Sequence, residues 1–320
     1  MSVALTRSRF TNALRCYASY ALSRFGSVRF VHHAPLFVSV EPAAICQLRC
    51  PECPVGKGTR DESRKSKALM SLDTWHRVLA EVRKTAFVVQ FYFQGEPLLN
   101  NDLPQMIREA HEAGLYSIVS TNAQALTPQM ATALVASGLD RIIISMDGLT
   151  EASYNAYRVG GSLEQTKAAL RYLREAKGRK PIIELQVLRL KTNEQEWADF
   201  KRQYKQLGAD CLTFKTAQLY NYSDGHPLMP TNARYSRYIQ GEDGHYHRRP
   251  LRRGCFRVWS GCVITTDGEV LPCCYDKAHS YAYGNIMESS LKELFTGTKA
   301  QQFRLAALDE RPHICQECWR

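Results

Sequence analysis

The stretch Cys46-Gln-Leu-Arg-Cys50-Pro-Glu-Cys53 places three cysteines in a C-x3-C-x2-C spacing. It follows an apolar run at residues 36–40 that ends at Glu41 and Pro42, and this run predicts a short buried strand. The cysteines therefore lie on the loop that leaves the carboxyl end of that strand. Three thiolates on one loop can face a single metal centre, and an iron–sulfur cube with three protein ligands keeps one iron open for chemistry. A partial zinc knuckle or buried structural thiols are the alternatives.

From residue 36 onward, strand-like and helix-like segments alternate. Strands are predicted at 36–41, 87–93, 115–120, 141–146, 181–189 and 211–216, and helices near 73–85, 103–113, 128–138, 163–177 and 194–207. Apolar strands that alternate with amphipathic helices are typical of βαβ units and a parallel sheet, so the predicted fold class is α/β. In parallel barrels the carboxyl ends of the strands carry the chemistry. We therefore expect the residues that follow these strands to form one site.

Four further stretches follow the predicted strands in order: Gln94-Gly95-Glu96-Pro97, Ser120-Thr121-Asn122, Ser145-Met146-Asp147-Gly148 and Tyr157-Arg158. Together with the cysteine spacing, this ordered set resembles the radical S-adenosylmethionine (SAM) enzymes. The resemblance implies a partial (β/α)6 barrel, in which a [4Fe–4S] cluster is held by the three cysteines and SAM chelates the fourth iron. It further implies that SAM is cleaved reductively to a 5′-deoxyadenosyl radical, with electrons from a flavodoxin- or ferredoxin-type donor. The family often has an aromatic residue where this chain has Glu52, at a position that shields the cluster.

The same resemblance assigns contacts to SAM. Gly95, Glu96 and Pro97 match the segment that binds the amino group of SAM, with Glu96 and backbone carbonyls as acceptors. Short polar groups at the next strand ends can bind the ribose or the methionine carboxylate; they are Ser120, Asn122, Ser145 and Asp147. Arg158 matches an arginine near that carboxylate, and Asn193 is a candidate contact for the adenosine. Outside this ordered set, such residues more commonly form turns and helix caps.

A second group of cysteines lies near the C-terminus: Cys255, Cys273 or Cys274, Cys315 and Cys318. The pair Cys315 and Cys318 forms a metal knuckle, and the run 268–272 predicts a hairpin that delivers Cys273. The segment 255–318 resembles the auxiliary-cluster domain known as SPASM, in its shorter twitch form. The resemblance implies a second [4Fe–4S] cluster, and four thiolates that leave no open iron suit electron transfer. A four-thiolate zinc site is the alternative.

We expect only one auxiliary cluster, because the sequence ends shortly after Cys318. The remaining cysteines Cys16, Cys211 and Cys262 are predicted to be structural thiols. The eleven cysteines of the chain are clustered, no secretory signal opens the sequence, and thiols held for metal favour a reducing, cytoplasmic location. No apolar run is long enough to span a membrane.

The predicted domains are a basic N-terminal segment (1–35), the barrel (36–216), a linker (217–254) and the cysteine domain (255–320). In the first segment, apolar residues recur at helical spacing and no acidic residue precedes Glu41; the apolar residues are Phe10, Leu14, Tyr17, Ala21 and Phe25. Such a helix could lie on an anionic membrane through residues 1–30 or serve as an organellar transit peptide. It could also pack against the barrel with its arginines in solvent.

The net charge of +11 could attract nucleic acid, anionic lipid or an acidic substrate. No nucleic-acid-binding module is recognisable in the sequence. A basic cluster precedes and enters the cysteine domain and could bind an acidic leader peptide; it contains Arg248, Arg249, Arg252, Arg253 and Arg257. The predicted function is a radical SAM oxidoreductase that modifies a peptide side chain by hydrogen abstraction. Dehydrogenation of a small-molecule alcohol or amino-sugar intermediate is the alternative, and a non-catalytic metal-binding scaffold is the alternative of another class.

Overall fold

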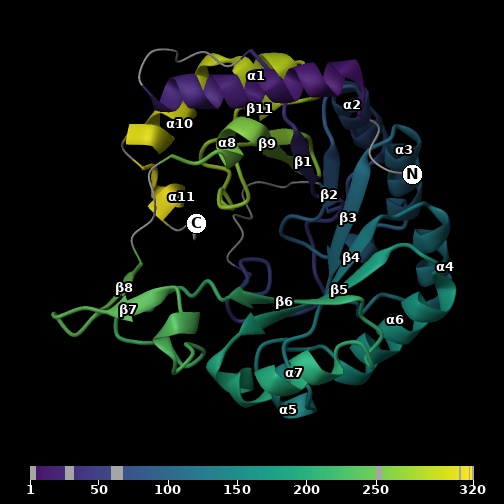
Figure 1. Cartoon of the computed structure of the whole chain (residues 1–320), viewed down its shortest axis with the longest axis vertical. Helices are drawn as coiled ribbons and strands as arrows, with labels where there is room; N and C mark the ends of the chain where they lie inside the picture. The colour runs from purple at the N-terminus through teal and green to yellow at the C-terminus, as the bar shows by residue number, and fades with distance from the viewer. Residues whose placement is uncertain are drawn as a thin grey trace.

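The barrel strands lie in one parallel sheet. The computed structural model describes residues 5–25, 32–58, 68–249, 254–309, 311–316 and 318. Its six barrel strands pair in chain order, each parallel to the next. They are β1 (Phe37–Val40), β2 (Val88–Phe91), β3 (Tyr116–Thr121), β4 (Arg141–Ser145), β5 (Ile182–Arg189) and β6 (Cys211–Thr216). The sheet curves with helices on its outer side (Figure 1), which confirms the predicted α/β partial barrel.

The helices on the outer face begin at residues whose side chains cap them. Ser71, Thr127 and Ser162 each accept a hydrogen bond from the backbone N–H three residues later, which satisfies one of the free N–H groups of the first turn. The helices are α2 (Leu72–Val82), α3 (Leu103–Glu112), α4 (Pro128–Ala136), α5 (Glu151–Asn155), α6 (Leu163–Ala176) and α7 (Trp197–Gln203), with short 3-10 turns η1 (Pro97–Leu99) and η2 (Lys191–Glu196). All five predicted helices are present. The one predicted at 194–207 is divided into η2 and α7.

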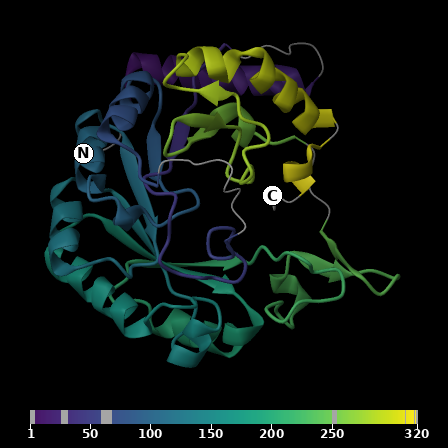
Figure 2. The ribbon, with the colours of Figure 1, turned by 180° about the vertical axis from the view of Figure 1, so that it is seen from behind.

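The C-terminal part continues the barrel sheet. Strand β9 (Gly261–Ile264) pairs in parallel with β1, and β10 (Glu269–Leu271) returns antiparallel to β9, which confirms the predicted hairpin. Gly261 faces Phe37 so closely that a Cβ atom would lie 2.3 Å from the phenyl ring, so a larger residue here would have to displace that ring. The remaining elements are β11 (Gly284–Asn285), α8 (Arg257–Ser260), α9 (Leu291–Thr296), α10 (Thr298–Asp309) and α11 (His313–Gln316). Seen from behind, the yellow helices α9 and α10 lie beside the purple α1 (Arg7–Arg24) (Figure 2).

Helix α1 packs on the fold with its polar face. Its buried residues are Arg9, Asn12, Cys16 and Ser19, whereas the apolar residues Phe10, Leu14 and Tyr17 are exposed. The guanidinium group of Arg9 donates to three backbone carbonyls: Gly114 O at 2.7 Å, and Arg83 O and Ala113 O at 2.8 Å. The prediction of a helix packed with its arginines in solvent is therefore wrong for Arg9, because these carbonyls compensate for its burial.

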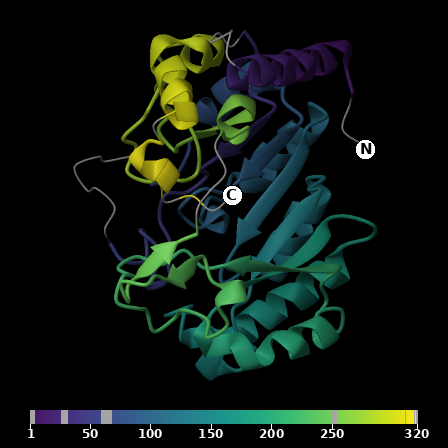
Figure 3. The same cartoon turned by 60° about the vertical axis from the view of Figure 1, so that its left-hand side comes forward.

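The segment predicted as a linker contains a small hairpin. It includes η3 (Ala233–Tyr235) and the antiparallel strands β7 (Tyr238–Gln240) and β8 (Tyr246–Arg248), which project beside the barrel (Figure 3). These strands were not predicted, because each has only three residues and the segment is rich in turn formers.

The basic cluster at 248–257 does not form one surface among its described members. Arg248 donates to Gln316 O, Arg249 donates to Ala233 O at 2.7 Å, and Arg257 lies in α8. Arg252 and Arg253 lie outside the described residues. Among the helices that the structure describes, none is both long and apolar enough to cross a membrane.

Candidate active site

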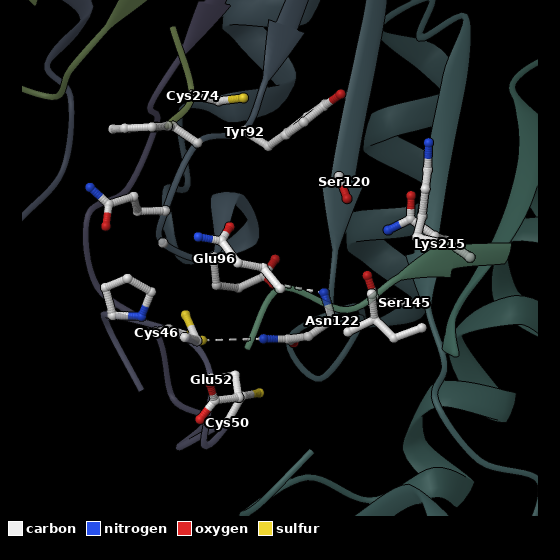
Figure 4. Close-up of a pocket in the computed structure, with 18 of the residues that line it drawn as sticks. Cys46, Cys50, Glu52, Tyr92, Glu96, Ser120, Asn122, Ser145, Lys215 and Cys274 are labelled. Carbon is white, nitrogen blue, oxygen red and sulfur yellow. Dashed lines mark hydrogen bonds between the residues drawn. The ribbon is translucent and has the colours of Figure 1, made fainter. Parts of the chain in front are cut away.

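The carboxyl ends of the barrel strands surround a cavity of about 500 Å³. The loop that follows β1 closes one side of it, and its three cysteines line the cavity together with Glu52. Figure 4 shows Cys46 and Cys50 at one end of this space and Cys274 with Tyr92 at the other. The sequence-predicted residues that line the cavity are Cys46, Cys50, Cys53, Gly95, Glu96, Ser120, Asn122, Ser145 and Arg158. The predicted residues Pro97, Asp147 and Asn193 are not part of its lining.

The cysteine loop supplies sulfur donors that already receive hydrogen bonds. The Cys46 Sγ accepts from Leu48 N and from Asn122 Nδ2, each at 3.4 Å (Figure 4), and hydrogen bonds to sulfur tune iron–sulfur clusters. Burial raises the pKa of the Cys46 thiol to about 11, although the Leu48 N–H opposes this shift. A metal bound at the loop would reverse this preference for the protonated thiol, because a thiol that coordinates a metal is deprotonated. The donor set fits a cluster, although no His, Cys, Asp or Glu group in the described ranges is arranged to hold a single metal ion.

Gly95 and Glu96 connect the cysteine loop to strands β2 and β3. A Cβ atom at Gly95 would lie 2.2 Å from Ala43 O, so only glycine permits this approach. The Glu96 carboxylate accepts from Thr121 Oγ1 at 2.5 Å, Asn122 N at 2.8 Å and Leu98 N at 3.1 Å. Burial raises the pKa of Glu96, and these three hydrogen bonds oppose that shift. The expected acceptor for the SAM amino group therefore has three of about four acceptor positions occupied by the protein.

Asp147 lies behind the cavity wall and holds Arg158. Its carboxylate is fully buried, accepts from Arg158 Nε at 2.6 Å, and accepts from Leu188 N at 2.6 Å. Burial lowers the pKa of Arg158, but the neighbouring acidic groups, Asp147 first and then Cys50, together raise that pKa above its ordinary value. The other end of the guanidinium group places Nη1 at 4.0 Å from the Cys50 Sγ. Asp147 thus holds Arg158 from behind the cavity wall, and its direct contact with SAM stays a prediction.

Asn193 has a similar supporting role. Its amide nitrogen donates to Asp147 O at 2.9 Å and to Leu188 O at 2.8 Å, and its side chain is buried. The bond to Asp147 O joins the loops that follow β4 and β5, and the contact of Asn193 with adenosine stays a prediction. Pro97 is also buried and starts η1, where the missing N–H of proline has no cost.

Glu52 attaches the cysteine loop to the segment after β6. Its carboxylate accepts from Tyr220 N at 2.5 Å and lies 3.1 Å from Lys57 Nζ and 3.6 Å from His226 Nε2. The family resemblance implies that a residue at this position shields the cluster. The contacts of Glu52 also hold Tyr220 and His226 over the loop.

Sequence reasoning did not place the far wall of the cavity, although it named Cys274 as a possible auxiliary ligand and Arg257 as part of the basic cluster. The additional lining residues include Tyr92, Gln186, Lys215, Arg237, Arg257, Cys274 and Lys277. Tyr92 follows β2 and Lys215 lies near the end of β6, so position after a parallel strand was the available signal. Burial raises the pKa of Tyr92 to about 12, while the charge of Arg257 opposes this shift.

The C-terminal cysteines line a second cavity of about 250 Å³. Cys255, Cys273, Cys315 and Cys318 all contribute to its wall, whereas Cys274 lines the barrel cavity instead. Burial raises the pKa of Cys315 to about 12. Arg257 lines both cavities. Position therefore favours Cys273 over Cys274 as the fourth member of this group, and the ligand itself stays a prediction.

The three thiols that were predicted to be structural lie apart from both cavities. Cys16 and Cys262 are buried, and Cys211 is half-buried at the start of β6.

Two family models match this chain. The radical SAM superfamily matches residues 40–203, and SPASM, an iron–sulfur cluster-binding domain, matches residues 255–319. Among curated relatives, the tungsten-containing aldehyde ferredoxin oxidoreductase cofactor-modifying protein of Pyrococcus furiosus is 26% identical, covering 88% of this chain and 86% of that protein. The PqqA peptide cyclase of Rhodopseudomonas palustris is 28% identical, covering 79% of this chain and 70% of the cyclase. The PqqA peptide cyclase of Ruegeria pomeroyi is 26% identical, and the match covers 90% of this chain and 80% of that cyclase.

Solved structures share the fold at low sequence identity. SuiB of Streptococcus suis has a TM-score of 0.67 at 14% identity and covers 94% of this chain and 77% of that chain. The anSMEcpe structure with bound AdoMet has a TM-score of 0.63 at 18% identity. The match covers 84% of this chain and 83% of that chain. BtrN in complex with AdoMet and 2-DOIA has a TM-score of 0.51 at 18% identity. The match covers 86% of this chain and 87% of that chain. With both family matches and the cysteine-lined cavities, the chain belongs to the radical SAM superfamily: it is an enzyme with SAM and a [4Fe–4S] cluster as cofactors, and its SPASM domain implies auxiliary iron–sulfur binding.

Proposed function

We propose that this enzyme oxidises a peptide side chain by hydrogen abstraction and passes the resulting electron to its auxiliary cluster. When bound, the first cluster and SAM supply a 5′-deoxyadenosyl radical. We assign its ligands as Cys46, Cys50 and Cys53. The auxiliary ligands are assigned as Cys255, Cys273, Cys315 and Cys318. The observation that carries the proposal is the wall between the cavities, where Arg257 lines both and the adjacent residues Cys273 and Cys274 line one each.

The protein's own groups would bind and orient the reactants. Arg158, held by Asp147, offers a guanidinium group to the SAM carboxylate. Asn122 donates to the Cys46 sulfur, and Glu52 holds residues 220–226 over the cysteine loop. That cover would limit water at the reacting atoms, which protects a reactive intermediate.

The charge of the far wall supports a substrate with an acidic group. The cationic residues that line it are Lys215, Arg237, Arg257 and Lys277, whereas the two lining carboxylates, Glu52 and Glu96, already accept hydrogen bonds from the protein. A cationic wall attracts an anionic group and helps to fix its register. An acidic peptide side chain fits this wall, and the similarity to two PqqA peptide cyclases supports a peptide.

Turnover with peptides tests this proposal. Anaerobic holoenzyme, SAM and reduced flavodoxin would be incubated with deuterated precursor peptides that carry Asp or Glu. We expect deuterium in 5′-deoxyadenosine and a peptide that has lost two hydrogen atoms. Replacing Cys46, Cys50 and Cys53 together with Ala should abolish 5′-deoxyadenosine formation while the C-terminal iron remains, because the two cysteine groups line separate cavities.

The variant Lys215→Gln tests the substrate class. It should raise KM for the acidic peptide about ten-fold or more, since a hydrogen bond to a charged group contributes about 1.5–3 kcal/mol. Lys205→Gln is the matched control, because Lys205 is exposed on the outer helix layer and lies outside the cavity lining. Turnover of a neutral small-molecule alcohol at equal rates in both variants, with no peptide product, would instead support the small-molecule alternative.

A further inference from the structure

Helix α1 and its neighbouring residues present large apolar side chains to solvent. Between 50% and 83% of the surface of each is exposed; the residues are Leu5, Phe10, Leu14, Tyr17, Leu22 and Phe25. Phe10, Leu14, Tyr17, Ala21 and Phe25 recur at helical spacing and form one side of the helix, which we call the apolar stripe. Leaving such a stripe in water is unfavourable, so it points to a partner surface.

The stripe is held in a fixed orientation. The Arg9 guanidinium group binds three backbone carbonyls, and the Asn12 side chain both donates to Ala34 O and accepts from Ala34 N. Tyr17 stacks on Phe256 with ring centroids 4.8 Å apart. A rotation of α1 that buried the apolar stripe would break these bonds and bury an unpaired arginine.

The helix lies at the end of the barrel opposite to the active-site cavity. The carbonyls that bind Arg9 belong to Arg83 and Ala113–Gly114, at the carboxyl ends of α2 and α3. These residues precede β2 and β3 and therefore lie at the amino ends of the strands, whereas the cavity is at their carboxyl ends. Figures 1 and 3 show α1 along the outer edge of the molecule. A partner on the stripe would leave the cavity accessible.

A basic notch runs beside the stripe. A cavity of about 360 Å³ is lined by Arg7, Ser8, Thr11, Asn12, Arg15 and Thr85. In the described part of the chain, neither arginine has an ion-pair partner, and the buried hydroxyl of Thr85 has no hydrogen-bond partner. Two guanidinium groups and a hydroxyl donor match the oxygens of a phosphate group.

We propose that α1 docks this enzyme on an anionic lipid bilayer, with the stripe in the headgroup–acyl boundary and a lipid phosphate in the notch. Aromatic and leucine side chains on one face with arginines beside them are typical of interfacial helices. Charge disfavours a second copy as the occupant: α1 carries arginines and no Asp or Glu, and a two-fold contact would place like charges together. The inference is independent of the proposed substrate.

Vesicle flotation of the anaerobic holoenzyme tests the proposal. The protein should float with vesicles that contain phosphatidylglycerol and much less with pure phosphatidylcholine, and added salt should weaken the interaction. Phe10→Ser with Leu14→Ser should lower the partition coefficient at least ten-fold. Arg7→Gln with Arg15→Gln should lower the partition coefficient about 25-fold, because each arginine near an anionic surface contributes a factor of about five. All four side chains are exposed on α1, so the fold should persist.

Matched controls separate specific docking from general effects. Met287→Ser removes an exposed apolar side chain elsewhere, and Arg171→Gln with Lys201→Gln removes two exposed charges from the outer helices; both should float like the parent protein. Equal flotation of the stripe variant and the parent, or no flotation of the parent, would overturn the proposal. A parent dimer that the stripe variant converts to a monomer in sedimentation velocity, without lipid binding, would identify a subunit interface instead.

Discussion

Cys273 and Cys274 are consecutive in the chain, yet their side chains line different cavities. Cys273 shares its cavity with the three other C-terminal cysteines, whereas Cys274 lies at the far end of the barrel cavity beside Tyr92 (Figure 4). Consecutive Cα atoms are about 3.8 Å apart. An electron that left a substrate beside Cys274 would therefore cross little more than one residue of backbone to reach the auxiliary site.

Serine substitution of these two cysteines should have unequal effects on iron content. We expect about eight irons in the reconstituted parent, about four in Cys273→Ser, and about eight in Cys274→Ser, since we assign only Cys273 as a cluster ligand. Anaerobic iron analysis and electron paramagnetic resonance would measure this. Equal iron loss in the two variants would mean that both thiols bind metal, and one stoichiometric zinc with about four irons in the parent would indicate a zinc site.

The variant Asp147→Asn should destabilise the fold and weaken SAM binding. It leaves the buried Arg158 guanidinium group without its counter-charge, and breaking a buried pair costs about 3–5 kcal/mol. Urea unfolding and a SAM titration would measure the two effects. Asp199→Asn is the control, because Asp199 pairs with Arg202 at the surface, where a pair contributes about 0–1 kcal/mol. A similar small loss in both variants would contradict the positioning role of Asp147.

The variant Glu52→Gln should loosen residues 220–226. The amide cannot balance the charge of Lys57, and its hydrogen bond from Tyr220 N is weaker than that of a carboxylate. We expect faster hydrogen exchange at Tyr220 and faster loss of cluster absorbance in air. Glu194→Gln is the matched control: Glu194 accepts from Thr231 on an exposed loop, so its loss should leave the cluster unchanged. Equal bleaching rates would show that Glu52 does not shield the site.

His33 should make the fold sensitive to mild acid. Burial lowers the pKa of His33 to about 4, although a hydrogen bond to Trp259 O at 2.7 Å opposes this shift. The neutral imidazole is thus favoured in the folded state, so its contribution is fully present above about pH 6.5 and is lost as the pH falls towards 4. We expect the parent to lose about 2 kcal/mol of unfolding free energy between pH 7 and pH 5 from this group.

Urea unfolding at the two pH values would measure that loss, and His33→Gln should remove it because glutamine can donate to the same carbonyl without titrating. His313→Gln, at an exposed position on α11, should behave like the parent. A pH dependence that is unchanged in His33→Gln would assign the acid sensitivity to other groups.

The barrel and most cavity residues were predictable because each depends on a local pattern. Strand and helix periods differ, and Cys46, Gly95 and Ser145 lie at or after the carboxyl ends of strands that meet at one edge. The features that could not be predicted depend on tertiary contacts. Helical spacing correctly identified the apolar face of α1 but could not show that the polar face, with Arg9, packs on the barrel. Likewise, no local pattern indicates that Asp147 supports Arg158 from behind or that Lys215 lines the cavity.

The parallel pairing of β9 with β1 makes the two cysteine regions depend on each other during folding. A chain cut after Thr216 would leave the backbone groups of β1 exposed along one edge, and such an edge recruits strands from other molecules. The missing strand lies between Cys255 and Cys273 in the sequence, so docking β9 also sets the spacing of two proposed metal ligands. A substitution that weakened the β1–β9 pairing would therefore disturb the barrel edge and the spacing of these two cysteines together.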